Sequence, residues 1–254
     1  LNSTPVTKRQ KFSHDIVFVG SLYSEKNPLA SASGLSEYTK GYIEGIMKAQ
    51  ESVYGYYFIE ELLTDDIVAE VKNSVQGFPA PPEKSFLTDK RIVSQEYIGN
   101  AITALERDDT FRMLSEHFHT TIYTGSDTTG LPKLENRGLA KSQEEMPVIF
   151  HGSKININTT SKPIRTGLPL RIFDILSCGG FCISNYQAEI PELFVPGEEI
   201  VMYESLDELQ ELCAYYLDHE SERRQIAEAG FEKLKKCYTY ETVLQKLLYT
   251  AFSS

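Results

Sequence analysis

Basic residues are scarce in this chain of 254 amino acids: 25 Lys and Arg stand against 36 Asp and Glu, a formal net charge of -11 at pH 7. Binding to the phosphate backbone of nucleic acid needs clustered Lys and Arg, so the charge balance argues against a nucleic-acid partner. No apolar run approaches the ~18 residues of a membrane span, and no secretory signal peptide is visible. We expect a cytoplasmic globular protein with no nucleic-acid partner and no membrane span.

Cysteine is also rare, with four residues: Cys178, Cys182, Cys213 and Cys237. None of them has CxxC spacing, and no His cluster lies nearby. Structural zinc sites usually show short, paired ligand spacings, so we expect no metal site. Reduced, buried thiols of a cytosolic protein are the favoured interpretation. The sequence also lacks a GxGxxG motif after any expected strand, which argues against a nicotinamide-dependent enzyme.

The first half of the chain predicts one strand followed by a long helical region. Residues 1–14 are polar and contain proline, which is typical of a linker or tail, and we place one domain at 15–254. DIVFVGSLY, residues 15–23, is an apolar run closed by Gly20, as expected of a buried strand that enters a turn. Helical patterning then extends over about 35–116, broken at 77–84. This is a large helical insertion after the first strand.

The second half alternates between strands and short helices. We expect strands at 119–125, 154–160, 181–186 and 199–203, and a very short strand at the end of the loop 126–138. Such alternation predicts an α/β fold: a Rossmann-like parallel sheet with helices on both faces. A capping box at Ser205 and Glu208 opens a tail of helices over about 205–252. The last of them, 239–252, carries an apolar stripe that we expect to be buried, formed by Val243, Leu244, Leu247 and Leu248.

The segment GLPLRIFDILSCGGFCIS, residues 167–184, carries the candidate chemistry. Pro169 suits the first helical position, and Gly167 lets the backbone approach a ligand. The free N–H groups of the first turn favour a phosphate, with Arg165 and Arg171 near enough to add charge-assisted bonds. Asp174 is a carboxylate suited to vicinal hydroxyls, such as those of a ribose. The alternative is that Arg171 and Asp174 form a simple i,i+3 ion pair on a solvent face.

Several motifs together resemble the CgeB-like glycosyltransferases, a group linked to bacterial spore maturation. The resemblance covers about residues 15–245 and includes these stretches: KININ (154–158), PLRIFD (169–174), GGF (179–181), ELFVPGEEI (192–200), IAEAG (226–230) and TYE (239–241). Upstream, DIVFVGSLY (15–23), KGYIEGIMKAQESVYGY (40–56) and NRGLAKSQEEMPVIFHGS (136–153) resemble the same family's middle section.

This resemblance implies the C-terminal, donor-binding half of a GT-B type glycosyltransferase. The substrate would be a nucleotide-diphosphate sugar, with UDP-sugars favoured and no further cofactor or metal. The sugar would pass to a protein or to a cell-envelope or spore-surface glycan. The acceptor domain of the full-length chain would lie outside this sequence, so we expect a hexosyltransferase type that is inactive as the isolated fragment. The alternative is a non-catalytic module for surface-layer or spore-coat assembly that keeps the fold.

The resemblance also implies site residues. The expected diphosphate contacts are Gly20, Ser21, Lys26, Arg165, Thr166, Gly167, Leu168 and Arg171. Asp174 takes the second, ribose-binding place of a Glu-x7-Glu motif, and Thr166 takes the first, so the usual sugar-contacting carboxylate is missing. The residues expected nearest the base are Gly125, Ser126, Gly138, Leu139 and Ala140. The base that activates the acceptor belongs to the other half, His117 and His119 receive no role, and His151 is a lesser candidate for donor contact.

Overall fold

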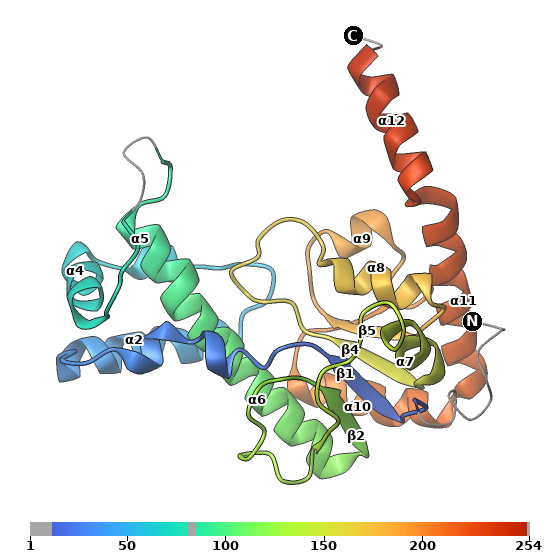
Figure 1. The fold of residues 1–254 in the computed structure, drawn as a ribbon, viewed down its shortest axis with the longest axis horizontal. Coiled ribbons are helices and arrows are strands. Elements are labelled where there is room, and N and C mark those ends of the chain that lie inside the picture. The colour runs from blue at the N-terminus through green and yellow to red at the C-terminus, as the bar shows by residue number, and fades with distance from the viewer. Residues whose placement is uncertain (1–11, 81–84, 253–254) are drawn as a thin grey trace.

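The computed structural model describes residues 12–80 and 85–252, and its centre is a parallel sheet of six strands (Figure 1). The strands are β1 (Ile16–Val19), β2 (Thr120–Tyr123), β3 (Glu135–Asn136), β4 (Ile155–Asn158), β5 (Cys182–Asn185) and β6 (Val201–Tyr203). They lie in the order β3-β2-β1-β4-β5-β6, with Ile16 paired to Thr120 on one side and to Ile155 on the other. This is the Rossmann order, so the predicted fold class is confirmed.

Helices cover both faces of the sheet, and its central strand β1 is apolar on both sides. Ile16 and Phe18 of β1 pack into one core cluster, and Val17 and Val19 pack into another. The first cluster is covered by α6 (Gly99–His117) and α10 (Leu206–Asp218). The second is covered by α7 (Met146–Gly152), α8 (Leu170–Ser177) and α9 (Ile190–Leu193). The long α11 (Glu220–Cys237) contributes to both clusters.

The helical insertion between β1 and β2 has a core of its own, built from residues between Ile43 and Ile102. Its elements are η1 (Ser24–Lys26), η2 (Pro28–Ser31), α2 (Glu37–Glu51), α3 (Ile59–Leu62), α4 (Asp65–Ser74), α5 (Asp89–Ile92) and the π-helical η3 (Val93–Ile98), which leads into α6. Within this region Ile92, Tyr97, Ile98, Ala101 and Ile102 are buried, whereas Leu105 on α6 is 44% exposed. Part of the expected break at 77–84, residues 81–84, lies outside the described residues.

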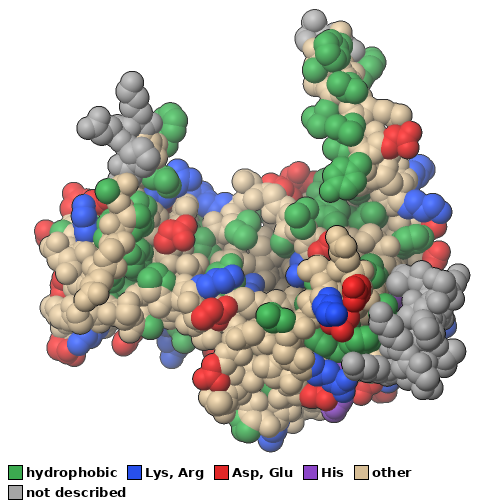
Figure 2. All heavy atoms as spheres, in the orientation of Figure 1, with side chains coloured by type: hydrophobic (Ala, Val, Ile, Leu, Met, Phe, Trp, Pro, Cys, Tyr) green, Lys and Arg blue, Asp and Glu red, His purple; other side chains and the backbone are tan. Residues whose placement is uncertain are grey.

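Two features of the ends differ from expectation. Residues 1–11 of the expected tail lie outside the described residues, whereas Phe12 and His14 are buried against the sheet. The last helix, α12 (Tyr240–Phe252), extends away from the body of the molecule (Figure 1). Its stripe is not buried, so that prediction was wrong: Val243, Leu244, Leu247 and Leu248 are 39–60% exposed. Figure 2 shows hydrophobic side chains gathered along α12.

The remaining sequence expectations have simple outcomes. Ser205 caps α10 as expected, accepting a hydrogen bond from the Glu208 backbone N–H at 3.1 Å. Cys182 and Cys213 are buried, and Cys178 and Cys237 are half-buried. Over 12–80 and 85–252, no helix combines the length and the apolar character that a membrane crossing requires.

Candidate functional site

The candidate site lies at the carboxyl edge of the sheet, where strand order reverses between β1 and β4. Ligands of open parallel sheets bind at such an edge, because neighbouring loops diverge there and leave a crevice. A cavity of about 220 Å³ opens at the ends of β4 and β5. It is lined by residues 53–57 of the insertion, by residues 185–188 at and beyond the end of β5, and by Lys162, Ile164, Arg165 and Thr166 after β4. Of the predicted site residues, Arg165 and Thr166 are therefore at the cavity.

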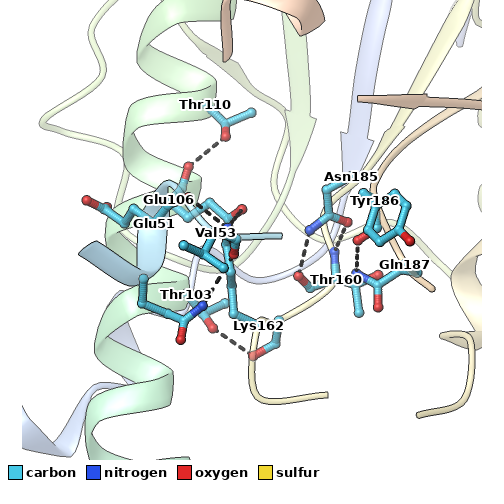
Figure 3. Close-up of polar contacts among 12 residues, drawn as sticks. Glu51, Val53, Thr103, Glu106, Thr110, Thr160, Lys162, Asn185, Tyr186 and Gln187 are labelled. Atoms are coloured by element: carbon cyan, nitrogen blue, oxygen red, sulfur yellow. Dashed lines mark hydrogen bonds and ion pairs between the residues drawn. The ribbon is translucent and has the colours of Figure 1, made fainter. Parts of the chain in front are cut away.

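Lys162 fastens the insertion to the loop that follows β4. Its ammonium donates to the backbone carbonyls of Glu51 at 2.7 Å and Val53 at 3.1 Å (Figure 3). The same nitrogen lies 3.6 Å from Glu106 Oε1 on α6, and both side chains are almost fully buried. It also sits 3.4 Å from the ring centroid of Tyr54. Four groups from the insertion thus surround one cation of the β4 loop.

Burial perturbs the titration of this cluster. Loss of hydration raises the pKa of Glu106 to about 7, although Lys162 and Arg107 oppose that change. Burial lowers the pKa of Lys162, and the Glu106 carboxylate opposes that shift. Burial also raises the pKa of Tyr54, so its phenol stays neutral at physiological pH.

Two further contacts fix the strand ends around the site. Arg107 of α6, a buried residue, donates from Nη2 to the Thr159 carbonyl at 2.6 Å and from Nη1 to the Ser21 carbonyl, which joins the β1 and β4 loops. The side chain of Asn185 makes two hydrogen bonds to the backbone of Thr160. Its Oδ1 accepts from the Thr160 N–H at 2.8 Å, and its Nδ2 donates to the Thr160 carbonyl at 2.9 Å (Figure 3). These hydrogen bonds fix the backbone that follows β1 and β4, next to the crevice.

The loop after β1 brings together two predicted site residues, Ser21 and Ser126. Both hydroxyls donate to the carboxylate of Glu25, at 2.6 Å and 2.8 Å. Burial pushes the pKa of Glu25 upward, but hydrogen bonds from Ser21, the backbone and Ser126 outweigh it and lower the pKa below its ordinary value. An anion therefore already lies beside Gly20, held by groups predicted to contact the donor. Lys26 lies over the ring of Tyr23, 4.8 Å from its centroid.

In the loop before α8, a carboxylate likewise accepts a hydrogen bond from a predicted diphosphate contact, Gly167. Its N–H donates to Glu189 Oε2 at 2.8 Å, and its φ of +81° is a left-handed conformation that glycine adopts without strain. Arg165 is exposed, and within the described part of the chain its guanidinium has no hydrogen-bond or ion-pair partner. Among the described residues the Arg165 guanidinium is thus left without an acidic partner, although the chain carries 36 acidic residues.

Arg171 and Asp174 pair with each other, at 3.2 Å from Nη1 to Oδ2. Arg171 also lies over the Phe150 ring, 5.4 Å from its centroid, and close to the sulfur of Met146. The pair is partly exposed on the side of α8 that faces α7, and neither residue lines the cavity. The helix begins one residue later than expected, since Pro169 is its N-cap rather than its first residue.

The residues predicted to lie nearest the base form a second group at this edge. A Cβ built on Gly125 would lie 3.4 Å from the side chain of Leu139, which is 80% exposed. Gly138 donates its N–H to the side chain of Asn136 at 2.9 Å, and Ala140 and Leu168 pack against the core cluster beneath α7 and α8. The structure brings Gly125 and Leu139 together and leaves the Leu139 side chain facing solvent.

The histidines lie away from the site. His151 Nδ1 is 2.8 Å from the Cys178 carbonyl, and both residues precede strands, at the opposite edge of the sheet. His119 pairs with Glu135 at 3.8 Å. The residues that sequence reasoning missed are Tyr54, Tyr56, Tyr57, Glu106, Lys162, Asn185, Tyr186 and Gln187. The one available signal was the tyrosine-rich run YGYYF at 54–58, which has no helical period.

Comparison with known proteins identifies a family for this chain. A family model described as glycosyl transferase-like matches residues 105–249, more than half of the chain. No curated protein matches the sequence. Among solved structures, a sucrose-phosphate synthase from Thermosynechococcus elongatus is similar, with 12% identity, a TM-score of 0.44, and coverage of 57% of this chain and 42% of that one. The pneumococcal O-GlcNAc transferase GtfA, in complex with UDP and GlcNAc, has 10% identity and a TM-score of 0.43 over 96% of this chain and 36% of that one. This chain thus spans less than half the length of either.

Proposed function

Since this chain belongs to the glycosyl transferase-like family, we propose that it is the donor-binding half of a GT-B type enzyme. Its substrate would be a nucleotide-diphosphate sugar, with a UDP-sugar favoured, and the sugar would pass to a glycan or protein acceptor. Within the family, the motifs from KININ at 154–158 to TYE at 239–241 support a CgeB-like, spore-associated member. The acceptor domain of the same full-length chain would supply the base that activates the acceptor.

The observation that carries this proposal is a pair of carboxylates at the predicted phosphate contacts. Glu25 accepts from Ser21 and Ser126 at 2.6 and 2.8 Å, and Glu189 accepts from Gly167 at 2.8 Å. Carboxylate and phosphate oxygens are both anionic acceptors, and both favour donors of this kind. The two loops therefore already bind anionic oxygen, at the edge where a parallel sheet binds its ligand.

The chemistry that this chain would supply is binding and charge stabilisation. The α8 N-terminus and the guanidinium of Arg165 would face the diphosphate, whose charge grows as the sugar leaves. Asp174 would accept bonds from the ribose hydroxyls, and the base would lie against the exposed Leu139 side chain. The remaining predicted diphosphate contacts, Gly20, Lys26, Thr166, Leu168 and Arg171, complete the proposal. No described side chain is assigned to proton transfer.

A non-catalytic assembly module is the second candidate, and one observation favours it. Thr166 stands where the resemblance expects the carboxylate that contacts the sugar. Such a module would keep the fold without binding a nucleotide.

Calorimetric titration separates the two functions. The wild-type chain is titrated with UDP, TDP, GDP and ADP, each with and without a sugar, and with NADH as a negative probe. The donor-binding function predicts saturable binding of at least one nucleotide diphosphate that weakens about tenfold or more in Arg165→Ala, since a charge-assisted contact is lost. Arg224→Ala, which removes an exposed guanidinium paired with Glu220 on α11, is the matched control. Absence of binding for the whole panel would favour the assembly module.

A further inference from the structure

The charges around the cavity at the ends of β4 and β5 leave one cation unmatched. Lys162 and Arg165 both line the cavity, and none of its lining residues is acidic. The Glu106 carboxylate, 3.6 Å from Lys162 Nζ, balances the first of these cations. In the described part of the chain no carboxylate pairs with the guanidinium of Arg165 in the same way. The cavity therefore carries a net positive charge in a chain whose net charge is -11.

The charge of Arg165 acts on the opposite wall of the cavity, which residues 53–57 of the insertion form. The Tyr56 hydroxyl donates to Glu61 Oε1 at 2.5 Å, and this bond raises the pKa of the Tyr56 phenol, whereas the positive charge of Arg165 opposes that rise. The Glu61 carboxylate is thus engaged with Tyr56 and does not line the cavity. The guanidinium is consequently near enough to bind a ligand between the two walls.

Aromatic side chains form much of the remaining surface. Tyr54, Tyr56 and Tyr186 all line the cavity. Gly55, at φ +75°, lies so close to Tyr186 that a Cβ would be 2.8 Å from its ring, so the wall of the insertion packs directly against the residues that follow β5. A left-handed backbone at this contact favours glycine. The two walls are thus in contact before a ligand binds, which lowers the entropic cost of binding.

Few polar groups of the lining remain free to bind a ligand. The amide of Asn185 and the hydroxyl of Tyr57 already bond to backbone groups. Across the described residues, the side chains of Arg165, Thr166 and Tyr186 have no hydrogen-bond partner. A guanidinium is a donor only, and it binds a carboxylate or a phosphate through two parallel bonds. The free groups of the lining therefore favour an anionic ligand.

The aromatic surface and the cavity size narrow the class of anion. A phosphate group would meet the guanidinium but has no apolar face to cover the tyrosines, whereas a sugar ring with a carboxylate uses both. The volume of about 220 Å³ falls below the roughly 300–1,000 Å³ of pockets for drug-sized ligands. It fits one ring rather than a whole nucleotide sugar.

We propose that this cavity binds the sugar ring of the donor, that the ring carries a carboxylate, and that Arg165 binds this carboxylate. The inference rests on the proposed function, because the ring is joined to a diphosphate at Gly167, two residues further along the same loop. A guanidinium has five N–H donors, so contact with a phosphate oxygen leaves donors for the carboxylate. The substrate class is thus a nucleotide-diphosphate uronic acid, and Arg165 is the residue that selects it.

The first test compares UDP-glucuronate, UDP-glucose and UDP by calorimetric titration. The two sugars differ only in a carboxylate that replaces a hydroxymethyl group. The wild-type chain should bind UDP-glucuronate about tenfold more tightly than UDP-glucose, which corresponds to ~1.4 kcal/mol. Arg165→Gln should weaken all three ligands through the diphosphate and reduce that preference to within about twofold. Arg224→Gln, at an exposed guanidinium paired with Glu220 on α11, is the matched control and should keep the preference.

A second variant tests whether the carboxylate lies in the cavity. Gln187→Glu adds a negative charge to the lining with almost no change in shape, at a residue outside the predicted diphosphate contacts. It should weaken UDP-glucuronate about tenfold and leave UDP-glucose within about twofold of the wild type. Gln225→Glu, the same change at an exposed residue of α11, is the control and should leave both affinities within about twofold.

The results separate this inference from the proposed function. Binding of UDP with equal affinity for the two sugars, or a preference for UDP-glucose, overturns the inference and leaves the donor function standing. A preference for UDP-glucuronate that survives both Arg165→Gln and Gln187→Glu also overturns it, because the carboxylate then binds elsewhere. If no UDP ligand binds, the proposed UDP donor fails, and methyl glucuronide and methyl glucoside decide the inference by NMR titration. Binding of the glucuronide alone supports it, whereas binding of the glucoside or of neither overturns it.

Discussion

Lys162 Nζ and Glu106 Oε1 lie 3.6 Å apart, with side chains only 5% and 6% exposed. Glu106 belongs to α6 and Lys162 to the loop after β4, so this contact joins the insertion to the sheet at the site (Figure 3). Above about pH 7, where Glu106 is ionised, each of these two buried charges compensates the desolvation of the other, so that removing one leaves the other uncompensated.

Loss of the Lys162 charge should therefore destabilise the protein strongly. Lys162→Met leaves Glu106 buried without its cation and removes two hydrogen bonds to the 51–53 backbone. We expect the free energy of unfolding in urea to fall by about 3–5 kcal/mol, and the double variant with Glu106→Gln to recover part of that loss. Lys40→Met, which breaks an exposed pair with Glu37, should change stability by less than about 1 kcal/mol. Equal effects of the two Lys→Met changes would contradict this account.

The raised pKa of Glu106 gives stability a defined pH dependence. Its value of about 7 in the folded state exceeds the ordinary 4.5, so between these values the folded chain holds a proton that the unfolded chain has released. The contribution of Glu106 to the free energy of unfolding is therefore fully present below about pH 4.5 and is lost as pH rises through about 7. His14 acts in the opposite sense, since burial lowers its pKa from 6.5 to about 4.

Glu106→Gln removes the pH dependence of stability that comes from Glu106 and leaves the one that comes from His14. The free energy of unfolding of the variant, minus that of the wild type, should rise on the order of 2 kcal/mol from about pH 5 to about pH 7.5. Urea unfolding at a series of pH values measures it. Parallel curves for the two proteins would show that Glu106 does not titrate in this window.

The Glu25 carboxylate should compete with a diphosphate for Ser21. Glu25→Gln removes the negative charge beside Gly20 and keeps the shape of the side chain, so we expect UDP affinity to increase several-fold, on the order of 1 kcal/mol. Glu232→Gln, which removes an exposed carboxylate paired with Lys235 on α11, is the control, and calorimetry is the measurement. Unchanged affinity in Glu25→Gln would remove Ser21 from the proposed diphosphate contacts.

Asp174→Asn distinguishes the ribose contact from a simple surface pair. The ion pair with Arg171 is partly exposed, so its loss should change stability by less than about 1 kcal/mol in either case. If Asp174 binds the ribose hydroxyls, UDP affinity should fall about tenfold or more. An affinity within about twofold of wild type would leave only the surface pair.

The sheet could be predicted because its strands carry local signals. The strand residues 16–19 are apolar on both faces, as expected of a strand that lies between two helical layers. The stripe of α12 shows the limit of this reasoning. A run such as Val243, Leu244 and Leu247 indicates an apolar face but does not say what covers it, and in the described chain that face is exposed.

The site was less predictable because its contacts join distant parts of the chain. The loop before α8 was found from Gly167 and Pro169, whose roles are local. Lys162 could not be found in this way, since its partners are the carbonyls of Glu51 and Val53, more than 100 residues earlier in the sequence. The cavity wall at 53–57 was missed for the same reason: it meets Tyr186 only after the insertion has folded.

A crystal structure of the chain with UDP tests the central claim most directly, because it locates the diphosphate between the β1 and β4 loops or elsewhere. We predict a phosphate oxygen in place of the Glu189 carboxylate at the Gly167 N–H, with the Arg165 guanidinium turned toward the diphosphate. A diphosphate bound away from this edge, with Glu189 still 2.8 Å from the Gly167 nitrogen, would contradict the account.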